Sequence, residues 1–270
     1  MRVALTGAGG IVGGFIARAL LRASHKVLPL GRPGWTLGGP DPDLTGVEAL
    51  VHCAFDHAPG RYRGGDRGDP VRFRALNLDG SSALFDAAER QGVTRIVFLS
   101  SRAVFDGYPP GTVLAEDLAP CPTESYGRIK AEAEARLARL SLSSASLRAT
   151  GVYGPGHANK WRGLFTEYLA GRPIQPRLAS EVHGEDLAAA VLLLLENPQI
   201  TGAVHCSDIL LDRHDLLSDV RMLTDCPHPP PSRAARAPNV LDCSRLRALG
   251  WRPGGEALLR ASLPILLRDL

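Results

Sequence analysis

The chain has 270 residues, of which 44% are hydrophobic and 22% are charged, and its formal net charge is +3. These values are typical of a globular protein with a large core, folded as one domain or as a domain with a small lobe. The net charge is too small to indicate nucleic acid or an anionic membrane as the main partner, so we expect neither.

The cysteines and the apolar runs indicate the compartment. The chain has five cysteines, and none of them are spaced as C-x-x-C. An odd number without that spacing predicts reduced thiols, with no metal site and no disulfide framework. No run reaches about 18 apolar residues, and the glycine loop that begins at Gly7 leaves no room for a signal peptide. We therefore expect a cytoplasmic protein without a membrane span.

Short apolar runs alternate with helical patterns along the first half of the chain. Strands separated by helices predict parallel pairing through right-handed crossovers. The expected fold class is therefore α/β, with a Rossmann-type doubly wound parallel sheet. Strands are expected at 2–6, 26–30, 48–55, 95–101 and 145–151, and helices at 15–23, 71–91 and 125–140.

The pattern changes after about residue 155, where helical segments dominate and a proline-rich link follows at 226–238. We expect residues 1–155 to form a dinucleotide-binding domain. Residues 156–270 are expected to form a small, mainly helical substrate lobe, part of which returns to the sheet.

A glycine-rich stretch, LTGAGGIVGG, joins the first expected strand to the first expected helix. In this context Gly7 permits a tight turn, Gly10 lets backbone amides approach a pyrophosphate, and Gly13 allows the helix to pack closely on the sheet. The free N–H groups at the helix N-terminus attract the same anion. We expect these glycines and Ile11 to bind a dinucleotide.

The segment YGRIK places Tyr126 and Lys130 four residues apart on an expected helix. Residues at i and i+4 share one helix face, so the ammonium lies beside the phenol and favours the phenolate. Tyr126 then becomes a usable proton donor and acceptor. Lys130 is one of only three lysines in the chain, which makes a chance pairing infrequent.

The spacing T-G-x-x-G-x-x-G, the Y-x-x-x-K pair and the strand end VFLSSRAVFDG resemble the extended short-chain dehydrogenase/reductase superfamily, also called the NAD-dependent epimerase/dehydratase family. The resemblance covers essentially the whole chain and implies a catalytic triad of Ser101, Tyr126 and Lys130, with Ser100 competing for the role of the serine. Ser101 would hydrogen-bond the reacting oxygen and hold it against Tyr126. The cofactor contacts that the resemblance implies include Ala54, Tyr126, Lys130 and Val152.

The end of the second expected strand, LPLGRPGW, bears on the choice of nicotinamide cofactor. Arg32 stands there in place of the acidic residue that binds the ribose 2′-hydroxyl of NAD. A guanidinium grips a 2′-phosphate that a carboxylate would repel, so we expect NADP(H) to be favoured, with NAD(H) as the alternative. Only residues 33–47 then precede the next strand, too few for the third strand and helix of the family. We expect a loop, with Asp43 and Leu44 as a remnant of the D-L motif near adenine.

Substrate contacts are expected from Asn77, Arg102 and Arg177. By resemblance, Asn77 begins an N-x-x-G-T helix near the active site, and Arg177 lies near the point where relatives hold a nucleotide diphosphate. Phe105 replaces the tyrosine of the S-S-x-A-V-Y-G motif, which leaves the substrate open. Residues 56–74 carry five arginines, and they form either a mobile flap over the substrate or a solvated loop.

These features predict an NAD(P)-dependent oxidoreductase that transfers a hydride to or from a carbonyl or hydroxyl carbon of a small or sugar-type substrate. Dehydratases of the family have an Asp-Glu pair after the catalytic hydroxyl, whereas Arg102 and Ala103 follow Ser101 here, which disfavours dehydration. A nucleotide-sugar epimerase with retained NAD is one alternative, and a non-catalytic dinucleotide-binding sensor or scaffold is another. The apolar faces of the helices expected at 71–91 and 125–140 are candidates for a homodimer interface.

Overall fold

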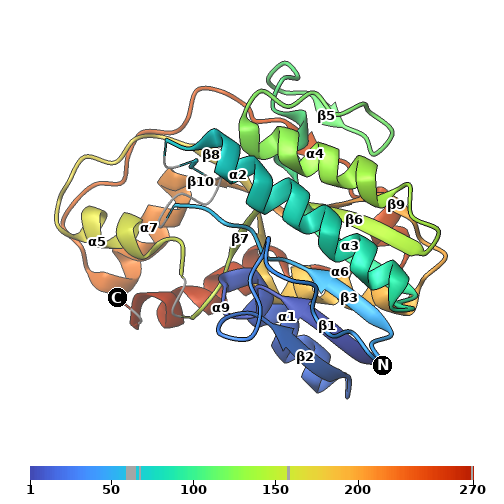
Figure 1. Ribbon diagram of the computed structural model, residues 1–270. Coiled ribbons are helices and arrows are strands. Elements are labelled where there is room, and N and C mark those ends of the chain that lie inside the picture. The colour runs from blue at the N-terminus through green and yellow to red at the C-terminus, as the bar shows by residue number, and fades with distance from the viewer. Residues whose placement is uncertain (59–64, 67, 157–158, 269) are drawn as a thin grey trace.

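The computed structural model describes all residues except 59–64, 67, 157–158 and 269 (Figure 1). Its centre is a six-stranded sheet in the order β2-β1-β3-β4-β6-β9, in which every neighbouring pair is parallel. This arrangement confirms the predicted Rossmann-type α/β fold. The strands are β1 (Arg2–Thr6), β2 (Lys26–Leu30), β3 (Ala49–His52), β4 (Arg95–Ser101), β6 (Ser143–Ala149) and β9 (Gly202–Cys206).

Helices cover both faces of this sheet (Figure 1). Helix α1 (Ile11–Arg22) packs with α6 (Gly184–Glu196) on one face, and α3 (Gly80–Arg90) packs with α4 (Ser125–Leu137) on the other. A separate apolar cluster lies on each face. The inner strands are therefore apolar on both sides, as is typical of parallel sheets, and all four residues of β3 are buried.

The helix expected at 71–91 is continuous but has three parts. Helix α2 (Pro70–Arg74) begins after Asp69, whose side chain accepts a hydrogen bond from the backbone N–H of Arg72. A π-helical turn, η1 (Ala75–Asp79), joins α2 to α3. Such turns shift the direction of the side chains that follow, and here the turn contains Asn77.

The connection from β2 to β3 contains no helix or strand, as predicted from its length. The loop nevertheless contributes to the core, because three of its own residues, Trp35, Leu44 and Val47, are buried there. The backbone N–H of Leu44 donates to the side chain of Gln91 at the end of α3, which fixes the loop against that helix.

The second half of the chain contributes to two regions. Strand β9 and helix α6 join the main sheet, whereas the lobe contains a three-stranded sheet in the order β10-β8-β7 as well as helices. The lobe is mainly helical, as expected, and its short strands form a sheet with β7, in the chain that leaves β6. The division at residue 155 stays a prediction.

The remaining elements are η2 (Arg102–Phe105), β5 (Val113–Leu114), β7 (Gly151–Tyr153), α5 (Arg162–Leu169), β8 (Leu178–His183), β10 (Ile209–Asp212), α7 (Arg213–Thr224), β11 (Val240–Leu241), α8 (Ser244–Ala248) and α9 (Gly255–Arg268).

Polar contacts at the start of α6 tie the lobe and the C-terminal segment to the sheet. The indole Nε1 of Trp251, a residue 1% exposed, donates to the backbone oxygen of Asp186 at 2.8 Å. The carboxylate of Asp186 accepts from the backbone N–H of Gly254 at 3.1 Å. His183 caps α6 and lies 3.3 Å from the hydroxyl of Ser262 on α9.

Within the described part of the chain, no helix has the length and hydropathy needed to cross a bilayer.

Candidate active site

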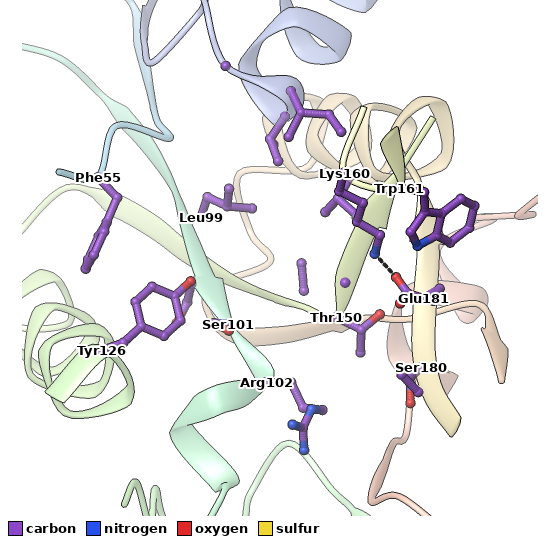
Figure 2. Close-up of a pocket in the computed structure, with 18 of the residues that line it drawn as sticks. Phe55, Leu99, Ser101, Arg102, Tyr126, Thr150, Lys160, Trp161, Ser180 and Glu181 are labelled. Carbon is purple, nitrogen blue, oxygen red and sulfur yellow. Dashed lines mark hydrogen bonds and ion pairs between the residues drawn. The ribbon is translucent and has the colours of Figure 1, made fainter. Parts of the chain in front are cut away.

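A cavity of about 1150 Å³ lies at the carboxyl ends of the main-sheet strands, beside the lobe. Open α/β sheets bind ligands at this edge, where the strand order reverses. The glycine loop after β1 lines part of the cavity, and residues of β7, β8 and α7 line the lobe side. Figure 2 shows Tyr126 and Ser101 on one side of this space and Lys160, Glu181 and Trp161 on the other.

The glycine loop after β1 is packed too tightly to hold side chains at two positions. Gly7 has a φ of +70°, and a Cβ on it would lie 2.9 Å from the backbone nitrogen of Ala54. A Cβ on Gly13 would lie 2.1 Å from the carbonyl oxygen of Gly7. Both glycines line the cavity together with Gly10 and Ile11. The loop and the N-terminus of α1 thus have a geometry that could hold a pyrophosphate.

A buried chain of hydrogen bonds holds the end of β3 beside this loop. The hydroxyl of Thr6 accepts from the backbone N–H groups of Cys53 and Ala54, at 2.9 and 3.0 Å, and lies 2.8 Å from Nδ1 of His52. Burial lowers the pKa of His52 to about 3, so the imidazole is neutral. Because Thr6 already accepts twice, its proton goes to Nδ1, and Nε2–H donates to Ser81 at 2.9 Å. The chain sets the position of Ala54 in the cavity wall.

Helix α4 carries Tyr126 and Lys130 to the cavity. Lys130 is 2% exposed, and its Nζ donates to the backbone oxygen of Leu99 at 2.7 Å. The same Nζ lies 5.9 Å from the ring centre of Tyr126. The Tyr126 ring also packs edge-on against Phe55, with ring centres 5.0 Å apart, and in Figure 2 its hydroxyl points toward Ser101 at the end of β4. The structure therefore brings the predicted triad together in one cavity.

The two serines at the end of β4 have different environments. Ser100 is buried and donates its hydroxyl to Glu134, which Arg148 holds in a buried ion pair at 2.7 Å. Ser101 is half-buried, and its hydroxyl oxygen accepts from the backbone N–H of Ala103 at 3.2 Å. Because the proton of Ser100 is committed to Glu134, Ser101 is the serine better placed to hold a reacting oxygen.

The residues predicted to contact the substrate are divided between the cavity and the loop behind it. Arg102 and Arg177 line the cavity, and Arg102 forms an ion pair with Asp106 at 2.8 Å. Asn77 is 1% exposed and is not among the lining residues. Its amide bonds the backbone N–H and carbonyl of Asp56 at 2.6 and 2.9 Å. Asn77 therefore fixes the loop after β3, since both of its polar atoms are already bonded.

Of the residues predicted to bind the cofactor, all but Arg32 line the cavity. Ala54 and Val152 line the cavity, whereas Arg32 is exposed beyond β2 and is not among the lining residues. Three of the five arginines in the stretch expected to be a flap or a solvated loop, Arg61, Arg63 and Arg67, lie outside the described residues. Within the described part, Arg74 forms an exposed ion pair with Glu132 at 2.6 Å, which is the behaviour of a solvated charge.

Sequence reasoning missed three charged residues on the lobe side of the cavity. Lys160 forms a buried ion pair with Glu181, and Arg213 lies near them at the start of α7. The available signal was the rarity of lysine, because Lys160 is one of three in the chain. No local pattern identifies Glu181, because its direction depends on the pairing of β8 with β7.

The buried ammonium of Lys130 makes stability depend on pH. Burial lowers its pKa from 10.5 to about 8, and the nearby Cys53 and Glu134 oppose this shift. Between these values the unfolded chain binds more protons, so the free energy of unfolding should rise with pH by at most about 1.4 kcal/mol per unit. Urea unfolding of the wild type and of Lys130→Met from pH 7.5 to 10 should show this rise only in the wild type. Parallel curves for the two proteins would contradict the assignment.

The comparison with known proteins agrees with this geometry. The chain is 25% identical over 293 residues to a probable dTDP-4,6-dihydroxy-2-methyloxan-3-one 4-ketoreductase of Streptomyces antibioticus, a match that covers 99% of this chain and 96% of that protein. It is 29% identical over 226 residues to methionine adenosyltransferase 2 subunit beta of Bos taurus, covering 74% of this chain and 64% of that protein. The chain spans 52% to 64% of the length of several curated relatives that it matches.

A solved structure is similar over nearly the whole chain. The UDP-glucose 4-epimerase of Thermus thermophilus, in complex with NAD, is 25% identical and superposes with a TM-score of 0.78, covering 98% of this chain and 99% of that one. The fold and the cavity define an enzyme of the extended short-chain dehydrogenase/reductase class. Within that class, the chain belongs to the family described as RmlD substrate binding domain, whose model matches residues 1–208.

Proposed function

We propose that the protein is a nicotinamide-dependent oxidoreductase that acts on a nucleotide-linked sugar through Ser101, Tyr126 and Lys130. The observation that carries this proposal is a single cavity lined by the triad and by the glycine loop. The loop fits a dinucleotide, because the lack of a side chain on Gly13 lets the N-terminus of α1 pack directly against the backbone of Gly7, at the end of the cavity where a pyrophosphate would lie. When bound there, the nicotinamide supplies or accepts the hydride.

The side chains around the triad have distinct roles in the proton transfer. In the reducing direction, Tyr126 donates its phenolic proton to the substrate oxygen as that oxygen gains charge, and Ser101 donates a hydrogen bond to the same oxygen. The ammonium of Lys130 stabilises the phenolate left behind. The backbone oxygen of Leu99 holds that ammonium in place, and Phe55 keeps the Tyr126 ring in position. In the oxidising direction the same groups act in reverse.

The charge on the lobe side of the cavity favours an anionic substrate. Lys160, Arg177 and Arg213 lie there, and Glu181 is the sole carboxylate among the described residues that line the cavity. Burial lowers the pKa of Arg213 and the charge of Arg177 lowers it further, while Glu167 and Glu181 oppose the shift, so further anionic neighbours would stabilise its charge. A diphosphate would supply those neighbours, and the similar T. thermophilus enzyme is named for UDP-glucose.

For the cofactor we propose NAD(H). The similar T. thermophilus structure is a complex with NAD, and Arg32, which suggested NADP(H), is exposed and away from the cavity lining. We expect NADH to have the lower KM, and Arg32→Ser to leave the ratio of the two KM values unchanged. A 2′-phosphate held by Arg32 would instead make the NADPH KM rise by about 10-fold in that variant. Titration of both cofactors with both proteins measures the ratio.

Turnover assays test the function and separate its two forms. For a reductase, purified protein should oxidise NADH when given 4-keto nucleotide sugars, followed by the loss of nicotinamide absorbance. For an epimerase, it should interconvert UDP-hexoses without net change in that absorbance. The ketoreductase relative favours the first form, and the epimerase structure favours the second. Failure to act on any nucleotide-linked sugar, with either cofactor, would reject the proposed substrate class.

A further inference from the structure

A buried ion pair lies in the cavity wall opposite the catalytic tyrosine (Figure 2). Lys160 precedes α5, and its Nζ donates to Oε2 of Glu181 on β8. Their side chains are 15% and 6% exposed, yet both residues line the cavity. Burying such a pair removes two charges from water, and it often gives no net stability over an apolar pair of similar volume. Its presence in a substrate cavity therefore indicates a role in binding.

The pair has hydrogen-bonding capacity left over. An ammonium has three N–H groups and a carboxylate has about four acceptor positions. Among the described residues, neither side chain forms a hydrogen bond other than the one between them. The neighbouring hydroxyl of Ser180, a residue 7% exposed that also lines the cavity, has no hydrogen-bond partner in the described part of the chain. Buried polar groups are normally satisfied, so this part of the wall has the capacity to bond a polar molecule in the cavity.

The backbone makes room for this pair. Gly151 on β7 is the register partner of Glu181 on β8. A Cβ on Gly151 would lie 2.3 Å from Oε2 of Glu181 and 2.8 Å from Nζ of Lys160. The charged groups therefore lie directly against the strand that continues from Thr150, another residue of the cavity wall. Nearby, Trp161 stacks on Tyr153 with ring centres 4.8 Å apart, which holds the chain beside Lys160 rigid.

We propose that Lys160 and Glu181 bind two adjacent hydroxyl groups of the substrate's sugar ring and thereby select a ring with a free vicinal diol. This inference rests on the proposed function and specifies its substrate. Glu181 accepts a hydrogen bond from one hydroxyl, and Lys160 donates a hydrogen bond to the oxygen of its neighbour. Held on this wall, the ring presents another of its carbons to Tyr126 and Ser101.

The choice of lysine supports this assignment over a phosphate contact. Of the 31 cationic lysine and arginine residues, only three are lysines, and this one lies in the substrate cavity. Arginine's planar fork suits phosphate and carboxylate, and Arg177 and Arg213 are available for those groups. An ammonium is a compact donor whose N–H groups rotate, so it can donate to a carboxylate and a hydroxyl at once.

The test compares nucleotide-linked hexoses with their 2-deoxy and 3-deoxy analogues. Wild-type protein should prefer the fully hydroxylated sugar over at least one analogue by about 100-fold in kcat/KM, since each hydroxyl bonds a charged group. Glu181→Gln and Lys160→Met should reduce this preference to a few-fold, chiefly through KM, with NAD(H) affinity unchanged. Glu167→Gln and Arg172→Met alter an exposed ion pair between α5 and the chain that follows it, and they serve as matched controls.

A double variant, Lys160→Glu with Glu181→Lys, separates binding from structure. It keeps an ion pair but moves each charged group to the other backbone position, where the different side-chain lengths no longer match the ring, so thermal stability should recover relative to the single variants while the preference stays lost. Recovery of both would show that the pair is structural and would overturn the proposal. If the double variant does not fold, a preference that survives in Glu181→Gln overturns it equally.

The outcome for the wild type distinguishes the two levels of inference. Equal use of hydroxylated and deoxy sugars would reject the role of the pair and leave the proposed function intact. Absence of turnover with every nucleotide-linked sugar would reject both.

Discussion

Replacing Tyr126 with phenylalanine should lower kcat by about 1,000-fold, because the general acid is removed while the ring remains. The ring packs against Phe55, and phenylalanine preserves that contact. NAD(H) affinity should therefore be kept, as measured by fluorescence titration. Loss of turnover with retained binding is the pattern that an enzyme, and not a binding module, should show.

Tyr108→Phe is the matched control for this variant. Tyr108 donates its hydroxyl to the backbone oxygen of Ala119 and is not among the residues that line the cavity. It should retain wild-type kcat and lose only a little stability. If Tyr126→Phe behaved like this control, the protein would be a dinucleotide-binding scaffold. The similarity to methionine adenosyltransferase 2 subunit beta makes that outcome worth measuring.

Replacing Gly13 with alanine should weaken NAD(H) binding by about 100-fold, since the new methyl group displaces the loop that cradles the pyrophosphate by close to 1 Å. The methyl carbon would lie 2.1 Å from the carbonyl oxygen of Gly7 and 2.9 Å from Cα of Ala8. These are backbone atoms, so no side-chain rotation relieves the contact. Calorimetric titration of NAD+ or NADH measures the loss.

The adjacent Gly14 provides the control. A Cβ on Gly14 would lie 3.7 Å from its nearest neighbours, which is an ordinary contact distance. Gly14→Ala should bind the cofactor normally and gain stability of about 0.5–1 kcal/mol, because alanine favours helix over glycine. Equal affinities for the two variants would contradict the assignment of the loop as the pyrophosphate site.

Local spacing was sufficient to predict the parts of the site that lie within one loop or one helix. The glycines of the first loop and the pair Tyr126 and Lys130 follow from offsets of three and four residues, so their placement needs no knowledge of distant contacts. The loop between β2 and β3 followed from chain length alone. The parallel sheet followed from the alternation of strands and helices.

Other parts depend on contacts between distant segments and were not predictable in this way. Ser100 and Ser101 are neighbours in sequence, and only Glu134 on α4 and Arg148 on β6 distinguish them. Asn77 lies in the π-helical turn and bonds the backbone of Asp56, a contact between separate segments that local spacing does not predict. Glu181 reaches the cavity through the register of β8 on β7, which no local pattern encodes.

The shortened connection after β2 has a consequence for association between molecules. Because residues 31–48 form no strand, β2 is the edge of the main sheet. An edge strand offers unpaired N–H and C=O groups to any other strand that approaches. Pro29 interrupts that row, since proline has no N–H to donate, and Lys26 places a charge at its start. The protein can therefore lack a strand beside β2 without leaving an edge that pairs readily with the sheet of another molecule.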